Sequence, residues 1–411
     1  MLRAPMSLAE VHDLPAWRRP EALLYLMAAA MPLSFATWSA LLNNFVIEAA
    51  AFTGKEIGWL HTVREIPGFL AIGVILILLV MREQVLALVA LALLGAASGV
   101  TAWFPSFTGI LVCTLLSSIG FHYFETVNQS LQLQWIDKDR APIVLGRILA
   151  VGAGASLAAY GAIVALWEAL GLDYNMVYLA SGGLTLAIVL VAALAYPQFE
   201  NPHPQHRHMV LRRRYWLYYA LQFMAGARRQ IFVVFAGFMM VERFGMKVGE
   251  MTALLLVNYL INMAIAPAMG RALGKYGERS VMGFEYVGLT LVFLAYGGLY
   301  WFGWGIVVAG GLYILDQLFF ALSFALRTYF QKIADPRDIA PTAAVAFTIN
   351  HIAAVFLPAA LGYMWAQSPD HVFLLGAGMA LVAFGLICLI PRHPAPGNET
   401  LFSRALPQPA E

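Results

Sequence analysis

Apolar runs long enough to cross a lipid bilayer recur along this chain, and they constrain its fold more than any other feature. A helix needs roughly 20 predominantly apolar residues to span a hydrocarbon core about 30 Å thick. Of the 411 residues, 61% are hydrophobic and 12% are charged, whereas soluble domains carry about 25% charged residues. We therefore predict an all-α membrane protein. The twelve predicted transmembrane helices are 22–50, 57–80, 85–103, 107–135, 143–168, 174–197, 216–241, 249–272, 281–301, 305–331, 341–366 and 371–390.

Arginine and lysine are distributed unequally between the two sets of connections that join these helices. One of the two sets contains few basic residues beyond Lys55, Arg243 and Lys247. The rich set contains Arg82; Lys138, Arg140 and Arg147; Arg207, Arg212, Arg213 and Arg214; Lys275 and Arg279; Lys332 and Arg337; and Arg392 and Arg404. The positive-inside rule places the rich set and both termini in the cytoplasm, which requires an even number of spans. We expect an integral protein of a bacterial-type inner (plasma) membrane.

The longest connection lies in the middle of the chain and divides six spans from six. Similar blocks recur half a chain apart: 137–142 precedes the fifth span, which closes on Trp167, and 335–341 precedes the eleventh, which closes on Trp365. A parallel repeat of two six-helix bundles around a central cavity leaves this kind of trace. The predicted order is a cytoplasmic tail (1–21), an N-terminal bundle (22–197), a basic cytoplasmic linker (198–215), a C-terminal bundle (216–390) and a cytoplasmic tail (391–411).

A polar stripe crosses the predicted fourth span. At about 100° per residue, one narrow arc of that helix collects Ser118, His122, Glu125, Gln129 and Gln132. Polar and ionisable groups are costly in hydrocarbon, so the stripe must face a protein interior or a water-filled cavity. His122 and Glu125 are either a proton-coupling pair or a structural histidine satisfied by a carboxylate.

The connection 270–279 resembles the loop signature G-x-L-x-D-R-x-G-R-R of the major facilitator superfamily of secondary transporters. Gly274 stands where the signature has aspartate, and four residues match it: Gly270, Lys275, Gly277 and Arg279. The signature normally follows the second span. Here that connection, 80–84, lacks it, so we expect a differently built cytoplasmic gate. The resemblance, which covers nearly the whole chain, implies alternating access and a cavity lined by the first, fourth, seventh and tenth spans.

Two adjacent arginines lie near the middle of the predicted seventh span. Adjacent residues cannot share a helical face, and Arg229 aligns with Gln222 one heptad earlier, so Arg229 is the better candidate for the cavity. Arg228 either meets the solute as well or pairs with a carboxylate between helices. A guanidinium stays charged when buried, and its planar fork suits a carboxylate or phosphate. We therefore expect a solute with an anionic group.

Candidate functional residues fall into three sets. Predicted substrate-binding residues are Asn44, His122, Gln129, Arg228, Arg229, Asp316, Asn350 and His351. Acids and histidines in an apolar setting can take up and release protons, and the predicted proton-coupling residues are Glu125, His122 and Asp316. Predicted gating residues are Arg64, Glu65, Lys275 and Arg279. Glu65 could instead simply neutralise its neighbour Arg64.

The sequence as a whole favours a proton-coupled secondary active transporter of a small polar, anionic or zwitterionic organic solute. One alternative is a transporter of a transition metal or metal chelate, because imidazole and carboxylate ligands could come from His122, Glu125, Asp316 and His351. Another is a sensor or assembly factor on a transporter fold that moves nothing.

The chain lacks a hydrolase triad, a phosphate-binding loop and a dinucleotide fingerprint, so we expect no enzymatic activity and no cofactor. The expected partners are a small-molecule substrate, protons and membrane lipids, the last through the basic linker. A net charge of +2 gives no reason to expect nucleic acid. We expect a monomer.

Overall fold

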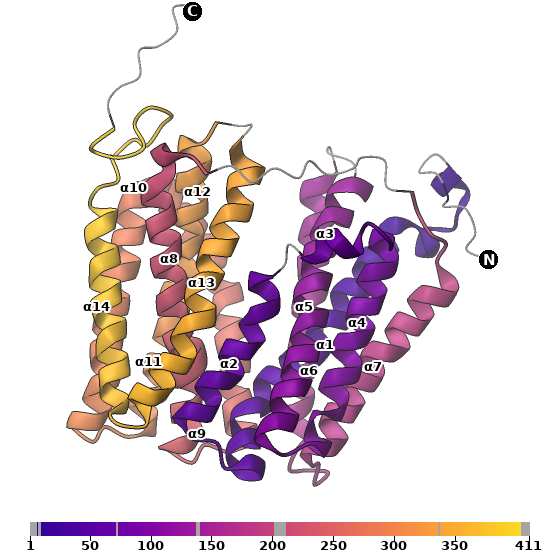
Figure 1. The fold of residues 1–411 in the computed structure, drawn as a ribbon, viewed down its shortest axis with the longest axis horizontal. Helices are drawn as coiled ribbons and strands as arrows, with labels where there is room; N and C mark the ends of the chain where they lie inside the picture. The colour runs from indigo at the N-terminus through magenta and orange to yellow at the C-terminus, as the bar shows by residue number, and fades with distance from the viewer. Residues whose placement is uncertain are drawn as a thin grey trace, which may run out of the picture. The chain divides into compact units, whose positions relative to one another are not determined.

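The computed structural model describes residues 6, 10–70, 73–136, 140–200, 211–335 and 338–403, which leaves parts of the predicted tails and linker outside the described residues. These residues form helices and no strand beyond two isolated bridges (Figure 1). The α-helices are α1 (Pro20–Ala50), α2 (Gly54–Phe69), α3 (Gly73–Ile77), α4 (Glu83–Val100), α5 (Phe107–Trp135), α6 (Ala141–Leu166), α7 (Tyr174–Ala195), α8 (Trp216–Gln230), α9 (Gly237–Glu242), α10 (Val248–Trp301), α11 (Ile306–Phe320), α12 (Phe324–Ile333), α13 (Ile339–Trp365) and α14 (Pro369–Ile387).

Ten segments of the described chain are helical, long and apolar enough to cross a membrane. One of them is α10, whose 54 residues cover the predicted eighth and ninth spans. Gly277 interrupts it with φ 76° and ψ 167°, a conformation that residues with a Cβ rarely adopt. The predicted second span is shared by α2 and α3, of 16 and 5 residues. The all-α membrane fold is confirmed, and the count of twelve follows if α10 is taken as two spans and α2 with α3 as one.

Local sequence explains where two of these helices begin. Ser106 precedes α5, and its hydroxyl accepts a hydrogen bond from the Gly109 backbone N–H at 3.1 Å. Asp173 precedes α7, and its carboxylate accepts one from the Met176 N–H at 2.7 Å. Such N-cap side chains satisfy backbone donors that the first helical turn leaves open.

Contacts divide the chain into two compact units. The N-terminal unit comprises Met1–Phe52, Val63–His206 and Lys247–Leu256, and the C-terminal unit comprises Thr53–Thr62, Arg207–Met246 and Val257–Glu411. The first turns of α2 therefore belong to the C-terminal unit, and the first turns of α10 belong to the N-terminal unit.

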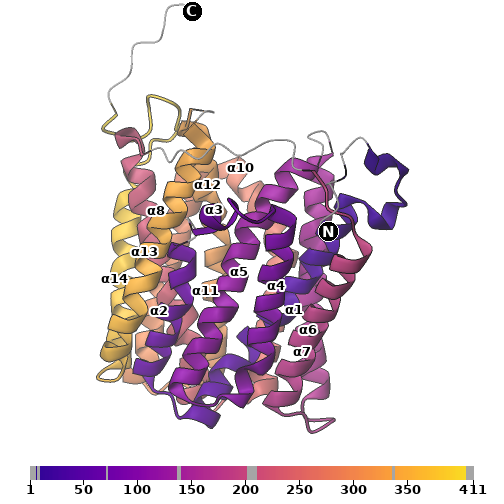
Figure 2. The same ribbon diagram turned by 45° about the vertical axis from the view of Figure 1, so that its right-hand side comes forward.

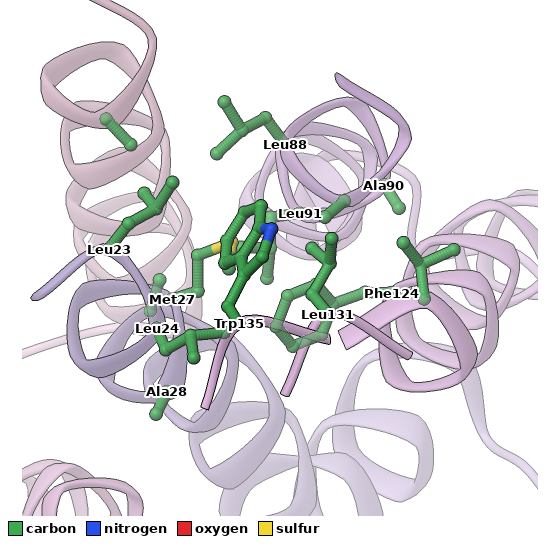
Figure 3. Packing of buried hydrophobic residues seen from close by; sticks show 14 of the residues in the cluster. Leu23, Leu24, Met27, Ala28, Leu88, Ala90, Leu91, Phe124, Leu131 and Trp135 are labelled. Carbon is green, nitrogen blue, oxygen red and sulfur yellow. The ribbon is translucent and has the colours of Figure 1, made fainter. Parts of the chain in front are cut away.

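In the N-terminal unit, α1 packs against α6 and α7, while α4 packs against α5 and α7 (Figures 1 and 2). Figure 3 shows Trp135, at the end of α5, among Leu24 and Met27 of α1 and Leu91 of α4. All four side chains are buried. Apolar packing of this kind joins the end of α5 to α1 and α4.

Small residues let the helices of this unit approach closely. A Cβ placed on Gly182 of α7 would lie 2.3 Å from the carbonyl oxygen of Gly95 on α4. Nearby, the hydroxyls of Ser34 and Thr185 lie 2.8 Å apart and join α1 to α7. Close backbone approach and interhelical hydrogen bonds are the main means of joining helices in lipid, where burial of apolar surface offers little.

The C-terminal unit repeats part of this arrangement. There α8 packs against α13 and α14, so the first helix of each half contacts the fifth and sixth of the same half. Opposite the basic end, Glu48 of α1 accepts a hydrogen bond from the hydroxyl of Tyr174 at 2.7 Å. Glu242 of α9 accepts one from the indole of Trp365 at 2.9 Å. Both observations fit the six-plus-six repeat.

Candidate functional site

The spans that carry Arg228 and Asp316 both depart from α-helical geometry beside these residues. The helix α8 ends at Gln230 and continues as a π-helix over Ile231–Ala236. The helix α11 ends at Phe320 and continues as a 3₁₀ turn over Ala321–Ser323. Such interruptions inside long helices occur frequently at functional sites.

A cluster of buried charges occupies the C-terminal unit between these helices. It consists of Arg228 of α8, Asp316 of α11 and Glu285 of α10, and each of these residues is only 1% exposed. Arg228 Nη1 lies 3.8 Å from Asp316 Oδ1, which is an ion pair too long for a hydrogen bond. The charge of Glu285 also interacts with those of Arg228 and Asp316. We call these three residues the buried triad.

Aromatic rings enclose the guanidinium of the triad. The Arg228 Cζ lies 5.3 Å from the ring centroid of Phe320 and 5.9 Å from that of Tyr286. Cations are attracted to such ring faces. Among the described residues, no hydrogen-bond partner meets the Arg228 side-chain nitrogens or the carboxylate oxygens of Asp316 and Glu285. The triad is therefore held mainly by charge and packing.

The neighbouring Arg229 lies in a different setting. Its side chain is exposed, and its Cζ lies 5.8 Å from the same Phe320 ring, 0.5 Å farther than that of Arg228. One phenyl ring thus contacts a buried guanidinium and an exposed one.

Asn350 and His351 lie on α13 in the same unit. The Asn350 amide donates to the Gln222 carbonyl at 3.3 Å, where a Cβ on Gly226 would come within 2.6 Å of the Asn350 carbonyl oxygen. His351 Nδ1 lies 2.9 Å from the Phe347 carbonyl oxygen. A carbonyl can only accept, so Nδ1 is the donor in this contact.

The N-terminal unit holds a second charged cluster, composed of Arg64, Glu65, His122, Ser118 and Trp38. Arg64 forms an ion pair with Glu65, with Nε 3.0 Å from Oε1, and its Cζ lies 5.4 Å from the Trp38 ring. The Ser118 hydroxyl donates to the Arg64 carbonyl. A Glu65 oxygen and a His122 ring nitrogen lie within 4.8 Å of each other. In this unit these two groups could serve as ligands to one metal ion.

The remaining predicted residues are spread over the two units. Asn44 is buried, with its amide 3.5 Å from the Glu48 carboxylate. On α5, Gln129 is exposed and Glu125 is partly buried. In the connection inside α10, Lys275 is exposed and lies over the Tyr276 ring. Arg279 of the same connection is partly buried.

Comparison with known proteins decides the family. The profile of the Major Facilitator Superfamily matches residues 23–358, most of the chain. The chain belongs to the major facilitator superfamily. Among curated proteins, no sequence match is found.

Solved structures agree with this assignment at the level of the fold. The nucleoside transporter NupG, in a crystal structure of a point mutant, has a TM-score of 0.73 at 14% identity, over 90% of this chain and 99% of its own. A bacterial homologue of the human lysosomal transporter Spinster, inward-facing and occupied, has a TM-score of 0.71 at 12% identity, over 94% and 98%. This member of the superfamily is thus an integral membrane protein with the fold of a secondary transporter.

In this superfamily member, buried acids hold the basic end of the C-terminal unit. Glu278, inside the loop that resembles the family signature, is buried and pairs with Lys332 at 2.7 Å. Asp338 precedes α13 and accepts from Arg212 at 2.5 and 2.8 Å, and from the Tyr215 hydroxyl at 3.0 Å. The hydrogen bond from Arg212 lowers the pKa of the Asp338 carboxyl, and Tyr215 and Arg214 add to the shift.

Three acidic residues of these clusters were not among the predicted site residues, namely Glu278, Glu285 and Asp338. For Glu285 a signal existed, since it is the one acidic residue in the predicted span 281–301. Glu285 lies in the ninth span, whereas the family resemblance implies a cavity lined by the first, fourth, seventh and tenth spans. The connections holding Glu278 and Asp338 offered no comparable signal, because charged residues are ordinary there.

One open depression lies within the C-terminal unit, at the end opposite the basic one, and none of the predicted substrate-binding residues lines it. Its volume is about 680 Å³, and its charged and aromatic lining comprises Lys55, Glu56, Glu242, Arg243, Tyr300 and Trp365. Arg243 stacks on Tyr300 with its Cζ 4.2 Å from the ring centroid. Charges of both signs in an open, solvated setting are a weak basis for a selective site.

Proposed function

We propose that this transporter moves a small polar solute with an anionic or zwitterionic group, and that it couples this movement to protons by alternating access. The observation that carries the proposal is the exposed guanidinium of Arg229 beside the buried triad. An arginine at this depth in an apolar span is costly unless it serves a pathway or a ligand. Its fork can bind a carboxylate or phosphate in a bidentate manner.

Phe320 supports the assignment of Arg229. The ring contacts both arginines and lies where α11 gives way to a 3₁₀ turn. A solute bound to Arg229 would therefore act on the same ring that contacts Arg228. This contact offers a physical route from solute binding to the ion pair between Arg228 and Asp316.

The proposed proton-coupling groups are His122, Glu125 and Asp316. His122 has a carboxylate neighbour in Glu65, and imidazole changes its charge near physiological pH. Asp316 is buried against Arg228. Both kinds of group alter their proton affinity when their surroundings change between dry and wet.

The test begins with a thermal-shift screen of metabolite anions against the purified protein at several pH values, because ligands that bind the folded state raise its apparent stability. We expect a carboxylate or phosphate compound to stabilise the wild type. Arg229→Ala should lose this stabilisation and the corresponding uptake into proteoliposomes. Arg271→Ala, which removes an exposed arginine from the connection inside α10, should keep both. Unchanged binding in Arg229→Ala would refute the assignment.

The proximity of Glu65 and His122 favours one second candidate, a transition metal or metal chelate as the solute. Imidazole nitrogen and carboxylate oxygen suit such ions, although Arg64 beside Glu65 disfavours a bare cation. Elemental analysis of the purified protein separates the two candidates. Metal that is present in the wild type and lost in both His122→Ala and Glu65→Gln supports the metal, and its persistence in both variants removes this candidate.

A further inference from the structure

We propose that the buried triad is an internal proton-binding site, in which Asp316 and Glu285 together hold one proton near the guanidinium of Arg228. Glu285 is not among the site residues predicted from the sequence. The site gives the proposed proton coupling a specific location in the C-terminal unit, and in that respect it rests on the proposed function.

The triad contains two acidic groups and one basic group. All three residues are buried, with 1% of each exposed, so water contributes little to their solvation. A guanidinium keeps its proton in any protein environment. If both acids were ionised, two negative charges would face one positive charge in a dry interior, and an unpaired buried charge is neutralised rather than tolerated. One proton on the two carboxyl groups restores neutrality.

Within the described part of the chain, the charge of Arg228 is the one that can balance the two acids. Among the described residues, Arg228 is the cation whose charge acts on both Asp316 and Glu285. Two tyrosines of α10 also interact with the triad, Tyr286 with Glu285 and Arg228 and Tyr296 with Asp316, and Tyr313 of α11 interacts with Tyr296. Phenols are neutral below about pH 10 and cannot balance a carboxylate. The proton therefore resides on the acids, and as in other coupled pairs it belongs to the pair rather than to either residue.

The geometry also allows the proton to be exchanged. Arg228 and Asp316 are 3.8 Å apart and share no hydrogen bond, so their separation is not fixed by a directional contact. A π-helix follows Arg228 by three residues, and a 3₁₀ turn follows Asp316 by five. Movement at either interruption that brings Arg228 nearer to one carboxyl favours release of the proton. Movement away favours its uptake.

Infrared difference spectroscopy tests this site on the full-length protein in lipid nanodiscs, recorded between neutral and alkaline pH without any solute. We expect the carbonyl-stretch band of a neutral carboxylic acid, equivalent to one proton per chain and shifted in heavy water. Glu285→Gln and Asp316→Asn should each abolish it, because either substitution leaves one carboxylate paired with one guanidinium. Glu278→Gln is the matched control, since it removes another buried acid of α10, the partner of Lys332, and it should keep the band.

Each outcome decides the proposal. A wild type without the band overturns it, and so does a band that survives in either Glu285→Gln or Asp316→Asn. Loss of the band in the Glu278→Gln control alone overturns it as well. If Glu285→Gln does not fold, Asp316→Asn decides alone, and Glu285→Asp, which keeps a carboxyl, should shift the band without removing it. The measurement needs no solute, so a failure of the proposed transport function would leave its result unchanged.

Discussion

In the N-terminal unit, Arg64 and Glu65 are neighbours in sequence and neutralise each other, whereas the buried triad of the C-terminal unit draws Arg228, Asp316 and Glu285 from three helices. The first pair is balanced in charge, with 15% of the Arg64 side chain and 6% of the Glu65 side chain exposed. The triad has one positive and two potentially negative groups at 1% exposure. An ion pair between adjacent residues can form with little contribution from other helices. The buried triad forms only when three helices are in register and, as proposed, a proton balances its charge.

The largest expected effect tests this difference directly. Replacing Arg228 by methionine removes the one cation that faces two buried acids, and breaking a buried pair in this way costs about 3–5 kcal/mol. Arg64→Met should cost less, because it leaves one buried acid rather than two and Glu65 has His122 nearby. Thermal unfolding of the purified variants measures both. Equal losses in the two variants would show that the units do not differ as described.

A smaller effect tests the close helix contacts of each unit. Gly182→Ala places a methyl group 2.3 Å from the Gly95 carbonyl oxygen, and overpacking of this kind costs about 1–3 kcal/mol. The adjacent Gly183 has nothing within 4 Å of its added Cβ, so Gly183→Ala is the control and should leave the melting temperature unchanged. Gly226→Ala, which would crowd Asn350 in the C-terminal unit, should resemble Gly182→Ala. A neutral Gly182→Ala would contradict the packing described for α4 and α7.

The smallest expected effect is a difference between acidic residues at the basic ends of the two units. Asp338 binds Arg212 and Tyr215, whereas Glu83 of the N-terminal unit accepts from the uncharged Ser130 and Gln134 at 2.8–3.2 Å. Asp338→Asn should therefore lower the melting temperature more than Glu83→Gln does, because an amide can still bond to neutral partners.

The effect of Asp338→Asn should also depend on pH. The pKa of Asp338 is lowered in the folded protein, so its contribution to stability is present above the pKa of the unfolded chain, about 4. This contribution is lost as the pH falls through the folded value. The difference in melting temperature between wild type and Asp338→Asn should shrink as the pH is lowered below about 4. A difference that is independent of pH would assign the effect to packing rather than to charge.

Much of the architecture was open to prediction from residue patterns. The predicted fourth span, 107–135, coincides with α5 (Phe107–Trp135), and the superfamily suggested by the 270–279 loop is confirmed. The residues that meet at the site were less predictable from the sequence. Arg228 and Arg229 could be predicted as site residues because they are charged residues within an apolar span. Glu285 lies in the ninth span, which the family resemblance does not place at the cavity. The partners of Asp338 and Glu278 lie in separate segments, which no local pattern brings together.

The sequence by itself determined that the chain crosses a membrane as helices, roughly where each crossing begins and ends, and that ionisable groups lie within the crossings. These are consequences of hydrocarbon thickness and of the need to satisfy every backbone polar group within its own segment. Only the tertiary structure decided which of those groups meet. Helix register in lipid depends on close contacts such as Gly226 against Asn350, and such contacts place Arg228 near two acids while the adjacent Arg229 stays exposed.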